Sequence, residues 1–216
     1  MTPTLHIIVA STRPGRVGLP VARWFREQAV GYDRFDLQWV DLAEWNLPFM
    51  NEPHHPRLRQ YTHDHTRRWS ALIDAADAFV LVMPEYNHGF TAPLKNAIDY
   101  LVHEWTYKPV GFVTYGGVAA GTRALQLLKP VLVGLKMTPI VEAVNIPFVS
   151  QLIKDGQLEA TESMAQAART MLAELERYEQ ALRPLRQASR TPTAAPSATA
   201  APTLTPAPTP TSTPAP

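Results

Sequence analysis

The sequence contains no cysteine, and this absence removes several kinds of chemistry at once. Disulfide bonds, thiolate nucleophiles, and zinc or iron–sulfur centres ligated by cysteine all need that sulfur atom. If the protein carries out redox chemistry, the electrons must therefore pass through a bound cofactor.

The sequence also lacks a strong excess of charge and any long apolar run. Its 20 Lys and Arg residues stand against 19 Asp and Glu residues, so the formal net charge is +1, and no run of like charge stands out. This balance disfavours a dedicated nucleic-acid binder. No apolar run approaches the ~20 residues of a membrane span, and the chain enters LHIIVA without a basic, signal-like stretch before it. We expect a cytoplasmic protein that binds neither nucleic acid nor membranes.

The 216 residues are 45% hydrophobic, which is enough to bury a full core in one domain. The composition changes near residue 189, where the chain becomes rich in Pro, Thr and Ala and carries no charge after Arg190. Such a segment has little to bury, so we predict a folded domain over residues 1–188 and a disordered tail over 189–216. The tail is either a low-complexity extension or a docking arm for a partner.

Short β-branched apolar runs alternate with helical stretches through the predicted domain. The runs predict strands at 4–10, 35–41, 77–83, 109–115 and 138–144, and the stretches predict helices at about 18–31, 57–76, 93–104, 121–135 and 159–187. Strict alternation indicates a parallel sheet covered by helices on both faces. We predict a flavodoxin-like three-layer α/β sandwich with strand order 2-1-3-4-5, in which ligands bind at the carboxyl ends of the strands.

The loop after the first predicted strand reads STRPGR and opens a helix. Ser11 and Thr12 supply hydroxyl groups, Arg13 and Arg16 flank the Pro-Gly turn, and the turn ends near Gly18. A helix N-terminus with two guanidinium groups suits a phosphate. The glycine patterns of dinucleotide-binding and P-loop proteins are absent, and an ordinary capped helix with two surface arginines is the alternative interpretation.

Two further loops follow the third and fourth predicted strands. PEYNHG at 84–89 combines Pro84 and Gly89 with the ring of Tyr86 and the amide of Asn87, which suits the edge of a flat heteroaromatic ring. TYGG at 114–117 contains two glycines that let the backbone approach a ligand closely. Because all three loops are expected at the same edge of the sheet, we interpret them as one binding site and not as three ordinary turns.

These segments resemble the NADPH-dependent FMN reductase family of the flavodoxin-like superfamily, which includes quinone, chromate and azo-dye reductases. The resemblance covers about residues 4–180 and rests on STRPGR at 11–16, PEYNHG at 84–89, LKNAIDYL at 94–101, EWTYKPVGFVTYGG at 104–117 and TRALQLLKPVLVGLKM at 122–137. It implies FMN as cofactor, NADPH or NADH as co-substrate, a small-molecule electron acceptor such as a quinone, and a homodimer or homotetramer.

The resemblance also implies a set of cofactor-binding residues. The phosphate would be held by the first loop, while the second loop would lie along the isoalloxazine ring and the third would border its other side; the residues are Ser11, Thr12, Arg13, Arg16, Gly18, Pro84, Glu85, Tyr86, Asn87, His88, Gly89, Thr114, Tyr115, Gly116 and Gly117. In this family hydride passes from the nicotinamide to the flavin and then to an acceptor by ping-pong turnover. No catalytic side chain is required, because the flavin carries the chemistry. His88 is a weak candidate for protonating an acceptor.

Other functions and other conspicuous residues stay open. An electron carrier would normally carry an acidic surface, which a sequence pI of about 8.1 disfavours, and a non-catalytic FMN-binding scaffold is the remaining class. The histidines at positions 54, 55, 63 and 65 lack the spacing of a metal site, so we predict no metal. Most tryptophans suit core positions, whereas Trp45 or Phe49 is expected to line a substrate pocket.

Overall fold

The computed structural model describes residues 2–190. Five parallel strands form one sheet in the order β2-β1-β3-β4-β5. Their bounds are β1 (Thr4–Val9), β2 (Asp36–Asp41), β3 (Ala78–Pro84), β4 (Pro109–Tyr115) and β5 (Thr138–Ile146). The predicted strand order is confirmed, and each predicted strand starts or ends within two residues of the observed one. The predicted tail began at residue 189, but residues 189 and 190 belong to the last helix. The rest of the predicted tail, residues 191–216, lies outside the described residues.

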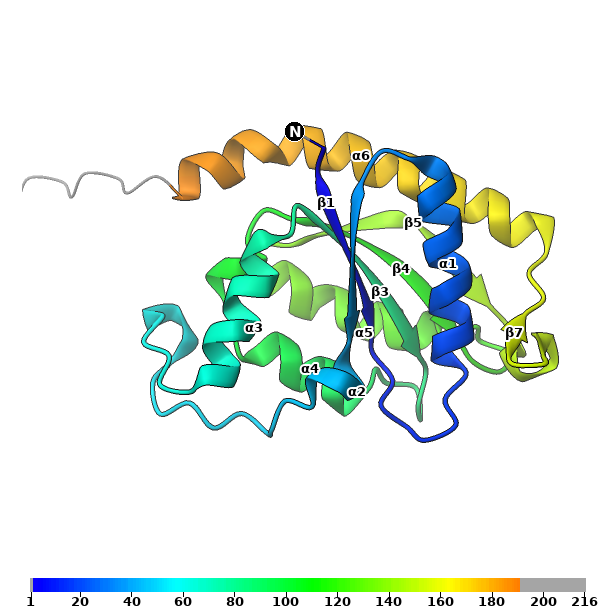
Figure 1. Cartoon of the computed structure of the whole chain (residues 1–216), viewed down its shortest axis with the longest axis horizontal. Helices are drawn as coiled ribbons and strands as arrows, with labels where there is room; N and C mark the ends of the chain where they lie inside the picture. Colours follow the sequence, from blue (N-terminus) through cyan, green and yellow to red (C-terminus); the bar gives the residue numbers. More distant parts are fainter. Residues whose placement is uncertain (1, 191–216) are drawn as a thin grey trace, which may run out of the picture.

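Helices cover both faces of the sheet, which confirms the predicted three-layer sandwich (Figure 1). On one face α1 (Gly18–Tyr32) and α6 (Glu162–Arg190) enclose one apolar core with the sheet. On the other face α3 (Asp64–Ala75), α4 (Ala92–Asp99) and α5 (Thr122–Gly134) enclose a second core. All seven residues of β3 and all seven of β4 are buried, because both strands are covered on both sides.

Several short elements were not predicted from the sequence. They are α2 (Leu42–Trp45), the 3₁₀ turns η1 (Pro56–Leu58), η2 (His103–Trp105) and η3 (Val149–Leu152), and a two-stranded hairpin of β6 (Ile153–Lys154) and β7 (Gln157–Leu158). Each has two to four residues, which is too short for a periodic pattern to reveal.

Two predicted helices were too long. The helix predicted at 57–76 begins only at Asp64, because the backbone N–H groups of Thr62 and His63 donate to the Glu52 carboxylate at 2.8 and 3.1 Å and are held outside the helix. The helix predicted at 93–104 ends at Asp99. There the buried indole of Trp69 donates to Ala97 O at 2.9 Å, and the indole of Trp105 donates to Ile98 O at 3.1 Å. Two indole side chains thus satisfy carbonyl groups at the end of α4, one from 28 residues before and one from 7 residues after its acceptor, and no helix-end pattern predicts them.

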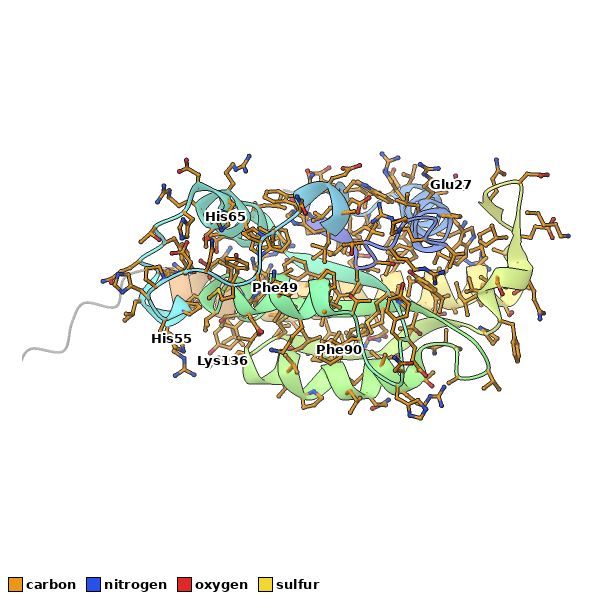
Figure 2. All side chains as sticks on the ribbon, turned by 90° about the horizontal axis from the view of Figure 1, so that it is seen from below. Glu27, Phe49, His55, His65, Phe90 and Lys136 are labelled. Atoms are coloured by element: carbon orange, nitrogen blue, oxygen red, sulfur yellow. The ribbon has the colours of Figure 1, made fainter. Side chains whose placement is uncertain are left out.

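The loops after β1, β3 and β4 lie side by side at the carboxyl edge of the sheet. Backbone hydrogen bonds join them to neighbouring strands: Ala10 N donates to Val82 O at 2.9 Å, Glu85 N to Tyr115 O at 3.1 Å and Gly116 N to Ile146 O at 3.2 Å. Figure 1 shows this edge at the bottom of the molecule, and Figure 2 views the molecule from below. The fold therefore brings together the three loops that the sequence singled out.

Candidate functional site

The loop from residue 12 to residue 18 presents unpaired backbone N–H groups at the start of α1. Within residues 2–190, only Arg16 N in this stretch donates a backbone hydrogen bond, to Arg13 O at 3.2 Å. The helix is capped by Val17, which has no side-chain hydrogen bond to offer, and its first turn contains no acidic residue. A helix of 15 residues that begins with free N–H groups favours an anion at this end. The structure thus provides a cradle that fits a phosphate group.

The two arginines of this loop have different roles. Arg16 forms a bidentate ion pair with Asp41 at the end of β2, with distances of 2.9 and 2.5 Å, and also donates to Ser11 O. Asp41 is buried, so this pair ties the loop to the sheet. The side chain of Arg13 is exposed and makes no hydrogen bond or ion pair with any described residue. Arg13 is therefore free to bind a phosphate, whereas Arg16 shapes the loop.

Tyr115 lies beneath the loop at residues 12–18. A Cβ atom on Gly18 would stand 2.5 Å from the Tyr115 hydroxyl, so only glycine fits there. The Tyr115 side chain is buried, and this burial raises its pKa well above the ordinary value, so the phenol is neutral. The sequence suggested that Tyr115 borders a ligand, but the structure leaves only its backbone to do so. Ser11 is also buried, with its hydroxyl 3.1 Å from that of Tyr86.

The loop after β3 forms a two-residue turn with both central residues in the left-handed region. Tyr86 N donates to Gly89 O at 3.0 Å and Gly89 N donates to Tyr86 O at 2.9 Å, while Asn87 has φ 49° and His88 has φ 69°. This geometry is that of a type I′ turn. Gly89, the residue expected to need special backbone freedom, does not have a positive φ, and an added Cβ would meet only Tyr86 O at 3.6 Å. The constraint predicted for Gly89 therefore lies at Asn87 and His88.

The Glu85 carboxylate is bound to the start of α5, the helix that follows β4. Its carboxylate accepts from Arg123 N at 3.1 Å and Ala124 N at 3.4 Å at the start of α5, and it pairs with the Arg123 guanidinium at 2.5 Å. Arg123 in turn lies 2.8 Å from Nε2 of His88, so that nitrogen accepts the hydrogen bond. Sequence reasoning missed Arg123, which no local motif distinguishes from other surface arginines. It links the loop after β3 to α5.

The loop after β4 is shaped by Gly116 and Gly121. A Cβ atom on Gly116 would stand 3.3 Å from Gly121 N, and Gly121 has φ 83° with Thr114 in the way of any side chain at 2.7 Å. The Thr114 hydroxyl is buried and donates within this loop, 2.7 Å from Ala120 O. Gly117 has no heavy atom within 4 Å of an added Cβ. Of the glycines predicted for this loop, Gly117 faces open space where a ligand has room.

A cavity of about 340 Å³ adjoins the phosphate loop at the carboxyl edge. It is lined by Thr12, Leu42, Ala43, Asn46, Leu47, Phe49, Ala92, Pro93 and Asn96. Trp45 instead packs against the buried Trp69, with ring centroids 5.2 Å apart. Of the two aromatic residues expected to line a pocket, only Phe49 lines this one.

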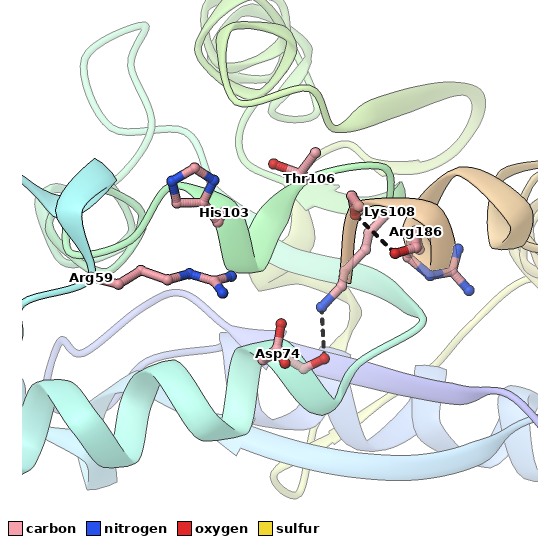
Figure 3. Close-up of a pocket in the computed structure, with 7 residues that line it drawn as sticks. Arg59, Asp74, His103, Thr106, Lys108 and Arg186 are labelled. Atoms are coloured by element: carbon pink, nitrogen blue, oxygen red, sulfur yellow. Dashed lines mark hydrogen bonds between the residues drawn. The ribbon is translucent and has the colours of Figure 1, made fainter. Parts of the chain in front are cut away.

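A larger cavity of about 450 Å³ lies at the opposite, amino edge of the sheet (Figure 3). Its cations already have protein partners. Arg186 pairs with Glu179 at 2.5 Å and with Asp77 at 3.0 Å, while Lys108 Nζ donates to Ile73 O at 2.7 Å. This cavity is therefore a packing feature around a buried polar network, and the candidate site is at the carboxyl edge.

The described residues were also compared with the requirements of a metal site and of a membrane-spanning helix. Within the described residues no three His, Asp or Glu side chains gather closely enough to hold a metal ion, and the rings of His63 and His65 stack on each other at 5.1 Å. None of the helices between residues 2 and 190 is long and apolar enough to cross a membrane.

The fold and the three loops define a flavodoxin-like protein with unpaired backbone N–H groups in the loop at residues 12–18. Sequence comparison agrees: the family model described as NADPH-dependent FMN reductase matches residues 3–151. An NAD(P)H-dependent FMN reductase of Schizosaccharomyces pombe is 38% identical over 77% of this chain and 86% of its own length. A second, from a Nectria species, is 34% identical over 76% of this chain and 89% of its own length. The chain therefore belongs to the NADPH-dependent FMN reductase family, a family of flavin-dependent oxidoreductases.

Solved structures agree on the fold. A flavoenzyme NAD(P)H:(acceptor) oxidoreductase from Paracoccus denitrificans superposes with a TM-score of 0.62 at 21% identity. The match covers 84% of this chain and 98% of that one. At this identity the likeness concerns the architecture alone.

Proposed function

We propose that this protein uses bound FMN to oxidise NADPH or NADH and to reduce small quinone-like acceptors by ping-pong turnover. The observation that carries the proposal is the N-terminus of α1, which has no side-chain cap and presents free N–H groups and the unpaired guanidinium of Arg13 beside a rigid turn at residues 86–89. The first feature fits the FMN phosphate, and the second fits the edge of a flat ring. Bound FMN supplies the redox chemistry, by accepting hydride from NAD(P)H and giving electrons to the acceptor.

The side chains and backbone of this chain bind and orient the flavin. We assign the phosphate to Arg13, Thr12 and the N–H groups up to Gly18, with Arg16 and Ser11 holding the loop in place. We place the isoalloxazine ring between the backbone of residues 84–89 on one side and the backbone of residues 114–117 on the other. No side chain needs to act as acid or base. His88 accepts a hydrogen bond from Arg123 at Nε2, so a proton can be donated there only after that bond breaks.

The quaternary structure belongs to the same proposal. Large apolar side chains are exposed on and around α5 and β5, namely Val118, Leu127, Val133, Val141 and Phe148, with Val141 79% exposed on the edge strand. An unpaired edge strand with apolar neighbours is typical of a surface that pairs with another chain. We propose a homodimer or homotetramer, which light scattering after gel filtration measures directly. The cytoplasmic location stays a prediction.

One experiment separates the enzyme from its alternatives. The purified protein is expected to be yellow, to lose its flavin absorbance within seconds of anaerobic addition of NADPH or NADH, and to regain it when 1,4-naphthoquinone is added. Initial rates at varied NADPH and quinone concentrations should give parallel double-reciprocal lines. If NAD(P)H does not bleach the flavin, the proposed enzymatic function is wrong and a non-catalytic FMN-binding scaffold remains. A flavin that is bleached but passes electrons only to a protein partner would indicate a carrier.

A further inference from the structure

The segment from Pro48 to Asn51 carries the exposed ring of Phe49, yet its backbone is tightly fixed. Asn96 Nδ2 donates to Pro48 O at 2.7 Å and its Oδ1 accepts from Met50 N at 2.9 Å. The hydroxyl of Tyr100 lies 3.0 Å from Pro48 O and 3.1 Å from Asn51 Oδ1. Two side chains from α4 and its end therefore hold consecutive residues of a segment that contains no regular structure.

Phe49 itself gains nothing from this arrangement in the isolated chain. Its side chain is 83% exposed, the highest value among the exposed large hydrophobic residues of the described chain. An exposed aromatic ring on a loose loop needs no explanation, but a ring held in water by a fixed backbone does. Figure 2, seen from the carboxyl edge, labels Phe49 over the central part of the molecule.

The cavity under Phe49 is neutral. Its lining residues are apolar except for Thr12, Asn46 and Asn96, and none carries a charge. Asn96 is occupied by the backbone of the 48–50 segment, and Thr12 belongs to the proposed phosphate site, whereas the side-chain amide of Asn46 makes no hydrogen bond with any residue between 2 and 190. A volume of about 340 Å³ is at the small end of the ligand-pocket range of roughly 300–1,000 Å³. These properties fit an uncharged molecule of one or two fused rings with a carbonyl group that can accept a hydrogen bond.

We propose that Phe49 is a specificity-determining residue that binds flat, uncharged, carbonyl-bearing acceptors of the quinone class. The ring of Phe49 stacks on the acceptor, while the side-chain amide of Asn46 donates to one of its carbonyl groups. The proposal rests on the proposed function, because it assigns the acceptor of the same flavin site. It places that acceptor beside the phosphate loop, on the side of α2 and α4.

The test measures quinone binding separately from turnover. FMN-loaded protein in its oxidised form is titrated with 1,4-naphthoquinone by calorimetry, with no NAD(P)H present, and KM is then measured for naphthoquinone and for ferricyanide. Phe49→Ala should raise both the Kd and the KM of naphthoquinone about tenfold, since lost aromatic contact and lost apolar burial act together. The KM of ferricyanide, a hydrophilic anion, should not change. The rate of flavin reduction by NADPH and the FMN content should also match the parent.

Two control variants make the result specific. Phe49→Tyr keeps the ring and should restore binding to within about twofold of the parent, because the stacking face is retained. Leu58→Ala removes another exposed apolar side chain, 58% exposed in the same connecting segment but outside the cavity, and should change nothing.

Three outcomes would overturn the proposal. They are an unchanged naphthoquinone Kd in Phe49→Ala, an equal loss with ferricyanide, and a lower oligomeric mass of Phe49→Ala, which would show that a second copy of the chain covers Phe49. If the proposed function itself fails, NAD(P)H does not bleach the parent flavin. The naphthoquinone titration is independent of that step, so the two failures are distinguishable.

Discussion

The polar groups at the two edges of the sheet differ in whether they have partners within the protein. At the amino edge the buried charges are paired: Glu179 accepts from both Arg183 and Arg186, and Arg186 also reaches Asp77. At the carboxyl edge the N–H groups of the 12–18 loop have almost no partners, and the Arg13 guanidinium has none within residues 2–190. These groups are largely exposed to water, and their gathering at a helix N-terminus favours an anion. The larger cavity lies at the paired edge, so cavity size alone would select a different end of the sheet from the one that the unpaired groups indicate.

Backbone strain does not follow this division, because Asp33, Tyr107 and Lys136 near the amino edge also have positive φ values of 54°, 58° and 59°. Asn87 and His88 at the loop after β3, and Ala120 with φ 52° at the loop after β4, are non-glycine residues in the left-handed region. Such residues persist only where the surrounding structure holds them. Here the Glu85–Arg123–His88 contacts do so. The carboxyl edge therefore differs from the amino edge in its open hydrogen-bonding groups and not in its strain, while the buried charge network of the amino edge stabilises the fold. The predictions below test whether stability and flavin binding can be separated in this way.

Removing Glu179 should have the largest effect. Glu179→Ala leaves the buried Arg186 with only Asp77 and the Tyr107 carbonyl as partners, and breaking a buried pair typically costs about 3–5 kcal/mol. We expect the free energy of unfolding in urea to fall by that amount, with FMN affinity of the folded protein unchanged. The matched control is Glu174→Ala on the same helix, whose partner Arg177 is exposed, and whose loss should cost less than about 1 kcal/mol. Equal losses in the two variants would show that the amino-edge network contributes nothing special.

Acid should destabilise the protein through His6, which lies in β1 near Lys108 and Asp77. Burial, followed by the positive charge of Lys108, lowers the pKa of His6 to about 4 from its ordinary value of 6.5, against an opposing effect of Asp77. The unfolded state therefore binds the proton more tightly than the folded state. The stability that the neutral ring contributes is complete above about pH 6.5 and is lost as the pH falls toward 4, a change of roughly 3 kcal/mol.

The comparison variant is His6→Leu, which cannot take up this proton. Urea unfolding of both proteins at pH 7.0, 6.0, 5.0 and 4.5 should show a shallower decline in the variant below pH 6.5. Parallel declines would assign the acid sensitivity to other groups.

The two arginines of the phosphate loop should differ in what their removal changes. Arg13→Ala should weaken FMN binding by about 1.5–3 kcal/mol, the usual value of a hydrogen bond to a charged group, without changing the stability of the flavin-free protein. Arg16→Ala should weaken FMN and also destabilise the flavin-free protein, because it leaves the buried Asp41 carboxylate without its ion pair. Fluorescence titration with FMN and urea unfolding of the flavin-free protein measure the two quantities. An Arg13→Ala protein that binds FMN like the parent would remove Arg13 from the site.

Much of the architecture was predictable because it depends on short-range pattern. Strands such as AFVLVMP are apolar throughout, and their alternation with helices fixes a parallel sheet and its carboxyl edge. What the sequence could not foretell depends on contacts between distant residues. Asp41 forms an ion pair with Arg16, Gly18 lies against the Tyr115 hydroxyl, and the indole of Trp69 donates to the Ala97 carbonyl at the end of α4. The sequence therefore located the loops of the site, and the structure was needed to assign different roles to neighbouring residues.

The smallest expected effect concerns the turn at residues 86–89, where sequence and structure point to different residues. Sequence reasoning singled out Gly89, but the positive φ values belong to Asn87 and His88. A β-branched residue in the left-handed region is disfavoured by about 1–2 kcal/mol, so Asn87→Val should lower the free energy of unfolding of the flavin-free protein by that amount. Gly89→Ala should leave it unchanged, because the added Cβ makes only ordinary contact with Tyr86 O. Asn87→Gly, which tolerates the turn, is the control for losing the amide alone. If Gly89→Ala destabilises the flavin-free protein as much as Asn87→Val does, then the strain lies at the glycine after all. If instead both fold like the parent and only Gly89→Ala loses FMN, the glycine serves the ligand and not the turn.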